Sequence, residues 1–251
     1  MPQYFFMPEA ELPPDVGFSH FDSGHLTALA ALTALSALVV LLGCHMSAQH
    51  RRRLLQAMAV AMVVMEILKD IILGWIGAFS VGYLPLHLCS IAMFVCLYWA
   101  WHPDSDGAGQ LLWGLCFAGG MAALLFPDWT QMPLLHFQSL HSFLYHAMLV
   151  QFALISVLSG QAQPRLQSVW KAGIFLLAVA VPVYLFDKLM DTNYMFLLRP
   201  IQGTPLELCA KIPGRWGYLV GYGLLAGAVL VVLDLPFSLW RRWNAHRSGA
   251  M

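Results

Sequence analysis

Residues 84–90 read LPLHLCS, and they place a proline, a histidine and a cysteine at the start of an apolar stretch. Proline fits the first turn of a helix, where its missing N–H group costs nothing. The sequence therefore predicts a helix that opens at Pro85 and carries His87 and Cys89 within its first turn and a half. The residues that follow are as apolar as a membrane span, so two polar side chains at this point need an explanation.

The composition is that of an integral membrane protein. Of the 251 residues, 59% are hydrophobic and 10% are charged, whereas soluble domains carry about 25% charged residues. Thirteen basic and thirteen acidic residues cancel, which argues against nucleic acid as a partner. The five cysteines include no CxxC pair, so neither a disulfide framework nor a thiolate zinc site is indicated. We expect no cofactor and no metal.

The fold class predicted is all-α, a polytopic bundle of about seven transmembrane helices in a single domain covering residues 1–251. Each apolar segment is near the ~20 residues that a bilayer requires. The segments are 25–46, 55–78, 85–101, 110–126, 138–159, 167–187 and 216–239. We expect residues 1–22 to form an extracytoplasmic lead-in and residues 240–251 to form a basic cytoplasmic tail.

The basic residues set the predicted orientation. With seven spans, three basic groups fall on one side of the membrane: Arg51–Arg53, the pair Arg165 and Lys171, and the C-terminal arginines. The positive-inside rule makes that side cytoplasmic. The N-terminus is then outside. The connection 188–215 carries four basic residues on the other side, yet it is too apolar and aromatic for a solvated loop. We expect a re-entrant or interfacial segment, with Arg199 available for an anionic group such as lipid phosphate.

With seven spans and the N-terminus outside, the ionisable residues in and beside the apolar segments lie at a similar depth in the membrane. Charged groups in hydrocarbon cost several kcal/mol unless they face a partner or a water-filled cavity, so we expect one polar cavity that opens toward the outer leaflet. The residues concerned are Glu66, Lys69, Asp70, His87, Cys89, His136, His141, His146, Asp187 and Asp191. Alternatively, Glu66, Lys69 and Asp70 form an ion cluster that only ties helices together, and Asp187 and Asp191 cap a helix or pair with Arg199 or Lys188.

Cys89 has two interpretations. Near a helix N-terminus the helix dipole favours the thiolate, which suits a nucleophile, but a lone membrane cysteine is more often a small buried hydrophobe. His87 lies about 200° from Cys89 round a regular helix, so a base must come from another segment. His136, His141 and His146 are candidates, each separated by five residues, about 140° round a helix. That spacing is not the i,i+4 pattern of a metal-binding pair, and each histidine could be simply buried and hydrogen-bonded.

Two motifs carry a family resemblance: LPLHLC at residues 84–89 and DTNYMFL at residues 191–197, with His146 between them. With them the chain resembles the YwaF-type bacterial membrane proteins, relatives of transmembrane protein 164, over nearly its whole length. The resemblance implies acyl transfer between phospholipids, in which a cysteine takes the acyl chain as a thioester and a histidine assists. Carried over, these residues are Cys89 and His146, with His141 as the next candidate base.

We therefore expect a membrane-embedded phospholipid acyltransferase or hydrolase of the cell membrane, for a bacterium the inner membrane, with a phospholipid or lysophospholipid substrate. Supporting residues would be His87, His141, Glu66, Asp191, Asn193 and Arg199, with His87 or Asn193 as candidate oxyanion donors. Two alternatives remain open. One is a small-molecule or ion transporter with Glu66, Lys69 and Asp70 along its path; the other is a metal-dependent lipid hydrolase using His25, His87, His141 or His146.

Overall fold

The computed structural model describes residues 2–248, with side chains over residues 3–239, and it is helical without strands over residues 2–248. The long helices are α1 (Ser23–His45), α2 (Ala48–Trp75), α3 (Leu88–Trp101), α6 (Phe137–Leu158), α7 (Val169–Met190) and α9 (Gly217–Ser248). The shorter ones are α4 (Asp106–Leu111), η4 (Leu112–Phe117), α5 (Ala118–Leu125) and α8 (Leu206–Ala210). Single turns are η1 (Pro2–Tyr4), η2 (Glu9–Glu11), η3 (Val81–Tyr83), η5 (Leu166–Ser168) and η6 (Tyr194–Phe196).

Six helical stretches are long and apolar enough to cross a membrane: 23–45, 81–101, 106–125, 137–158, 166–190 and 217–239. They correspond to six of the seven segments predicted from the sequence. The seventh, α2, carries Glu66, Lys69 and Asp70 and falls outside this group. Its outward face is nevertheless apolar, with Val60, Val64, Ile67 and Ile71 exposed.

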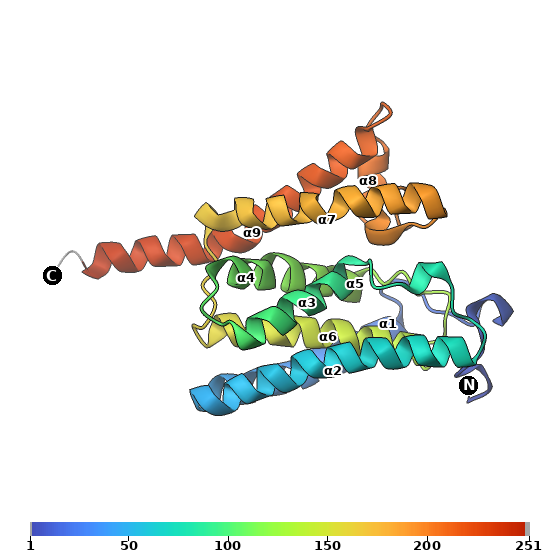
Figure 1. The fold of residues 1–251 in the computed structure, drawn as a ribbon, viewed down its shortest axis with the longest axis horizontal. Coiled ribbons are helices and arrows are strands. Elements are labelled where there is room, and N and C mark those ends of the chain that lie inside the picture. Colours follow the sequence, from blue (N-terminus) through green and yellow to red (C-terminus); the bar gives the residue numbers. More distant parts are fainter. Residues whose placement is uncertain (1, 249–251) are drawn as a thin grey trace.

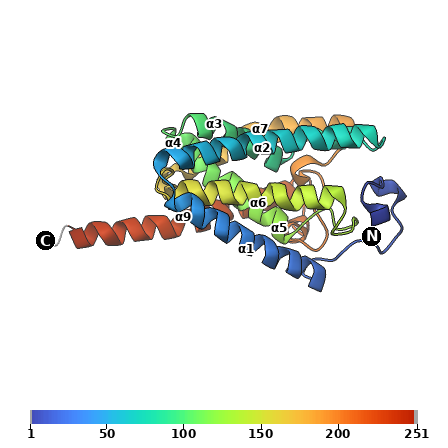
Figure 2. The same cartoon turned by 90° about the horizontal axis from the view of Figure 1, so that it is seen from below.

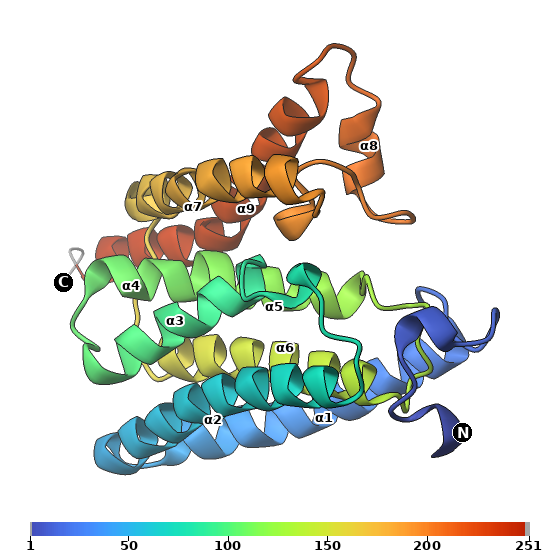
Figure 3. The ribbon, with the colours of Figure 1, turned by 45° about the vertical axis from the view of Figure 1, so that its right-hand side comes forward.

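Helix α6 lies at the centre of the larger of two groups of helices. It packs against α1, α2, α3, η4 and α5, and most of its residues are buried. The main core cluster, which includes Met62, Trp99, Leu112 and Phe152, is built mainly between α2, α3, η4 and α6. Helices α7 and α9 form a second group with α8 at one end, seen above the others in Figure 1 and from a second angle in Figure 3.

The segment 106–125 runs as one continuous helix through α4, η4 and α5. Its middle part, η4, is a π-helix, a rare form that is found at functional sites more often than chance predicts. Helix α5 approaches α6 closely because Gly120 has no side chain: a Cβ there would lie 3.1 Å from the carbonyl oxygen of His146. The absence of a side chain at this glycine therefore fixes the spacing between the two helices at His146.

The two ends of the chain lie at opposite ends of the bundle (Figure 1). The lead-in is held by backbone hydrogen bonds, Phe18 N–H to Thr130 and Phe137 N–H to Phe5. Helix α9 continues past residue 239 and projects beyond the other helices (Figure 2). The predicted tail therefore begins as an extension of α9 over residues 240–248, while residues 249–251 lie outside the described part of the chain.

The start of α3 differs from the prediction, which placed Pro85 in the first helical turn. The helix begins at Leu88, and His87 is its N-cap residue with an extended backbone (φ −67°, ψ 152°). Proline pushes the residue before it out of the helical region, and Leu84 is accordingly extended (φ −59°, ψ 151°). A tight turn from Leu86 N–H to the Leu84 carbonyl follows at 2.7 Å. The helix thus starts three residues later than predicted.

Candidate functional site

A cavity of about 1240 Å³ lies between the two groups of helices. One side is polar and comes from α2, α3 and α6, whereas the other is apolar and comes from α5, α7 and α9. The polar and sulfur-bearing side chains on its wall include Glu66, Lys69, His87, Cys89, Ser90, His141, Tyr145 and His146. Six of the ten ionisable residues expected in one cavity line it: Glu66, Lys69, His87, Cys89, His141 and His146. The other four, Asp70, His136, Asp187 and Asp191, are not among its lining residues.

Cys89 is the second residue of α3, and it is partly buried at the wall of the cavity. The first N–H groups of any helix lack intrahelical partners, and His87 provides no side-chain cap for them. The backbone N–H groups of Cys89 and Ser90 therefore lie beside the thiol at the positive end of α3. The Cys89 carbonyl accepts a hydrogen bond from the Tyr145 hydroxyl at 3.4 Å, which ties α3 to α6.

His146 lines the same cavity from the middle of α6 and is only 6% exposed. Its Nδ1 lies 2.7 Å from the carbonyl oxygen of Ser142. Because a carbonyl can only accept, Nδ1 carries the proton, and in the neutral imidazole Nε2 keeps its lone pair. The ring stacks on Trp129 at 5.4 Å with 14° between the planes. The imidazole is thus fixed in both orientation and tautomer.

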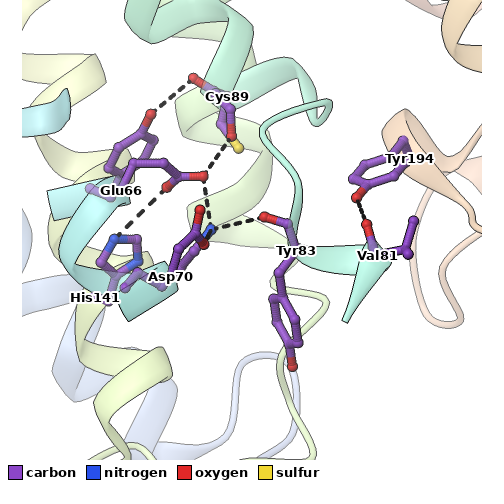
Figure 4. A network of polar contacts seen from close by, with 10 residues as sticks. Glu66, Asp70, Val81, Tyr83, Cys89, His141 and Tyr194 are labelled. Carbon is purple, nitrogen blue, oxygen red and sulfur yellow. Dashed lines mark hydrogen bonds and ion pairs between the residues drawn. The ribbon is translucent and has the colours of Figure 1, made fainter. Parts of the chain in front are cut away.

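Glu66 is at the centre of a buried network that joins α2, α3 and α6 (Figure 4). Its Oε1 accepts from Lys69 Nζ at 2.8 Å and from the Ser90 hydroxyl at 3.2 Å. Lys69 Nζ also lies 3.3 Å from Asp70 and 3.5 Å from the Tyr83 carbonyl. The charged cluster predicted as a structural tie therefore exists, and it also forms part of the cavity wall.

His87 reaches the cavity as well, although a regular helix would have turned it away from Cys89. Because it precedes the helix in an extended conformation, its side chain is not bound by the helical spacing assumed from the sequence. The ring packs against Tyr194 at 4.8 Å and Phe196 at 5.7 Å. His87 thereby connects the start of α3 to the segment after α7.

That segment, 191–199, contributes apolar residues to the cavity, whereas its polar residues are used in the loop itself. Met195, Phe196 and Leu197 line the cavity. The Asn193 side chain accepts from two backbone N–H groups and donates to the Arg199 carbonyl at 3.0 Å. Asp191 and Arg199 form a 3.7 Å ion pair with side chains 96% and 65% exposed. None of these three polar residues is on the cavity wall.

Asp187 and Tyr194 hold this segment in place. The fully buried Asp187 carboxylate accepts from the Thr192 hydroxyl at 2.7 Å and from Tyr194 N–H at 2.9 Å. The Tyr194 hydroxyl donates to the Val81 carbonyl, as Figure 4 shows. Burial raises the pKa of Tyr194 to about 12, so the phenol keeps the proton that it donates. Asp187 thus holds the loop after α7, whereas Asp191 forms the predicted pair with Arg199.

Glu9, from the lead-in, also borders the cavity. Burial, and next the nearby carboxylate of Asp128, raise the pKa of Glu9 above its usual value. No sequence pattern associates Glu9 with the site, because only the folded lead-in brings it there.

The other histidines predicted on this side are structural. His25 is fully buried, with Nδ1 accepting from Phe21 N–H and Nε2 facing the Leu124 carbonyl, each at 2.9 Å. His136 caps α6 by accepting the Gln138 N–H. Among the described residues, no group of three or more His, Cys, Asp or Glu side chains could hold a metal ion.

Sequence reasoning also missed two further features. Trp129, which orients His146, lies in a loop and has no helical pattern to mark it. Gln110 donates to the buried Asp234 of α9 and accepts from Arg165 N–H at 2.9 Å. A single acid in the apolar stretch 216–239 is a signal that could have revealed this contact. Neither Gln110 nor Asp234 lines the cavity.

The family model of the TMEM164 family matches residues 18–234. This chain belongs to the TMEM164 family. No curated protein and no solved structure matches it. The matched range extends from the end of the lead-in to α9, so the cavity of this TMEM164-family protein lies almost wholly within the part shared with the family. The family assignment and the apolar helices together make it a multi-pass membrane protein.

Proposed function

We propose that this protein is a phospholipid acyltransferase that carries the acyl group as a thioester on Cys89, with His146 as the general base. The observation that carries the proposal is that a thiol and an imidazole of defined tautomer, from two different helices, line one cavity. Covalent catalysis requires a nucleophile and a base that a third group orients, and the lining of this cavity contains both.

In the acylation step the Cys89 sulfur attacks the ester carbonyl carbon of the donor phospholipid. The thiol proton passes to Nε2 of His146 and then to the alkoxide oxygen of the departing lysophospholipid, as the S–C bond forms and the ester C–O bond breaks. Nδ1–H of His146 stays hydrogen-bonded to the Ser142 carbonyl throughout. That carbonyl stabilises the imidazolium, as an orienting group does in other nucleophile–base pairs.

The start of α3 provides a site for the developing oxyanion. Backbone N–H groups at a helix N-terminus stabilise negative charge, and those of Cys89 and Ser90 adjoin the sulfur. Asn193, the alternative donor predicted from the sequence, has its amide engaged within its own loop. The helix start is therefore the better-supported oxyanion site.

The apolar side of the cavity suits an acyl chain. On α9 its lining residues run from Leu219 to Leu233, which spans about 21 Å along a helix. One leaflet of a bilayer provides about 15 Å of hydrocarbon. The apolar side of the cavity is thus long enough for a whole acyl chain, and the ester of that chain would lie at the polar side.

Labelling with an electrophilic lipid probe tests the proposal. We expect the probe to label the wild-type protein in membranes and to lose all labelling in Cys89→Ala. Cys44→Ala is the matched control, because Cys44 lies on α1 outside the cavity lining. His146→Gln should reduce labelling about 100-fold or more, the usual contribution of a general base. Undiminished labelling of Cys89→Ala would contradict the proposal.

A further inference from the structure

Glu66 and His141 present two polar atoms to each other without a hydrogen bond between them. Nε2 of His141 lies 4.0 Å from Oε2 of Glu66, which is longer than a hydrogen bond. The two side chains are 10% and 9% exposed, and both line the cavity. Within the described chain, Nε2 has no hydrogen-bond partner. A buried polar atom of this kind is costly, so it points to a ligand.

The charges of the surrounding network restrict the chemistry of that ligand. Oε1 of Glu66 accepts from Lys69 and Ser90, so Oε2 is the carboxylate oxygen left for another donor. Lys69 Nζ donates to Glu66 and to the Tyr83 carbonyl and forms a 3.3 Å ion pair with Asp70. Two carboxylates thus face one ammonium group, which leaves no net positive charge for an anion. A neutral hydroxyl fits this position, whereas a phosphate does not.

The pair lies close to Cys89. Ser90, which donates to Glu66, is the next residue along α3, and Tyr145, which donates to the Cys89 carbonyl, stacks on His141 at 5.5 Å. His141 and His146 are five residues apart, about 140° round α6. The two imidazoles therefore reach the cavity from different directions.

We propose that Glu66 and His141 bind and deprotonate the hydroxyl group that accepts the acyl chain from Cys89. A hydroxyl group can bridge a pair 4.0 Å apart, donating its proton to Oε2 of Glu66 and accepting from an Nε2–H of His141. The inference rests on the proposed thioester function, and it assigns the second half of the reaction to this pair. The acceptor is a hydroxyl group, supplied by a lysophospholipid or by water.

In this step the acceptor oxygen attacks the thioester carbonyl carbon. The new C–O bond forms, the C–S bond breaks, and the hydroxyl proton passes to Oε2 of Glu66 while His141 holds the hydroxyl oxygen. The Cys89 thiolate then recovers that proton, which restores the thiol and the Glu66 carboxylate. No oxidant, reductant or cofactor is needed.

The experiment follows formation and decay of the thioester on the wild-type protein in vesicles of phosphatidylethanolamine with a radiolabelled acyl chain. One arm contains added lysophospholipid and reports labelled diacyl lipid, and the other lacks it and reports free fatty acid. The variants are His141→Gln and Glu66→Gln. His102→Gln is the matched control, since His102 is exposed at the far end of α3. Hydroxylamine, which cleaves thioesters chemically, confirms the linkage in every sample.

We expect Glu66→Gln to form the thioester within about twofold of the wild-type rate and to lose it about 100-fold more slowly, the scale of general base catalysis. His141→Gln removes the imidazole that holds the hydroxyl oxygen and should slow the loss in the same direction, and His102→Gln should match the wild type. The inference is overturned if decay is unchanged in His141→Gln, or if that variant fails to form a thioester that Glu66→Gln still forms. A wild-type protein that forms no thioester would instead refute the proposed function itself.

Discussion

Replacing Glu66 by Gln tests whether the buried network holds the helices together. Gln has nearly the same size and can still accept from Ser90, but it removes the negative charge 2.8 Å from Lys69. Both side chains are well buried, with exposures of 13% and 9%, so solvent screens the pair little.

Removing one partner of a buried ion pair costs about 3–5 kcal/mol, because the other charge stays buried without compensation. Asp70 remains 3.3 Å from Lys69, so we expect the lower end, about 3 kcal/mol. For a chain of this size, 1 kcal/mol shifts the unfolding midpoint by about 2–4 °C. Glu66→Gln should therefore lower the midpoint by about 6–12 °C.

The assay is thermal unfolding of the purified protein in detergent, with Glu207→Gln as the control. Glu207 is exposed on α8, and such surface changes stay within about 0.5 kcal/mol. Adding Lys69→Met to Glu66→Gln should recover part of the loss, because no unpaired ammonium then remains. A midpoint within about 2 °C of the wild type for Glu66→Gln would refute this reasoning, as would a double variant that loses the sum of the two single losses.

Three further predictions concern packing, the loop after α7 and pH. Gly120→Val should lower the free energy of unfolding by about 1–3 kcal/mol, because the new side chain overpacks against α6, and it should lower probe labelling by displacing His146. Gly74→Ala is the control, because a Cβ at Gly74 meets no atom within 4 Å, and it should change neither quantity. Equal unfolding midpoints for the two variants would contradict this prediction. Tyr194→Phe should cost about 1 kcal/mol through the lost hydrogen bond, measured as the same midpoint shift, and no shift would show that the bond is dispensable. Backbone N–H groups at the α1 N-terminus lower the pKa of Asp22 below its usual value. The ionised carboxylate therefore stabilises the fold at any pH above that usual pKa. This stabilisation is lost as the pH falls through the lower pKa of the folded state. Asp22→Asn should therefore flatten the acid limb of a plot of midpoint against pH, and an unchanged limb would argue against the cap.

Hydropathy alone predicted six of the helices, because burial of apolar residues in lipid and span length leave a strong pattern in the sequence. The cost of ionisable groups in hydrocarbon also predicted a shared cavity, which six of the ten expected residues line. These two inferences depend on bulk properties of whole segments, and neither needs the position of any single atom.

Local backbone geometry and loop contacts could not be predicted in this way. Pro85 was compatible with a helix start, but the turn around it delayed the helix to Leu88 and brought His87 into the cavity. Trp129 and Asn193 lie in loops, where their partners depend on how the chain folds back. Asn193 carried the right chemistry for an oxyanion donor, yet its amide is used in a hydrogen bond within its own loop.

The most direct test of the account is the mass of the protein after incubation with phospholipid vesicles whose acyl chains carry a heavy isotope. We predict a hydroxylamine-sensitive gain equal to one labelled acyl group, mapped by peptide analysis to Cys89 and absent from Cys89→Ala. An unmodified protein, or an acyl group attached equally to Cys44 or Cys209, would contradict the central claim that this cavity holds an acyl-carrying thiol.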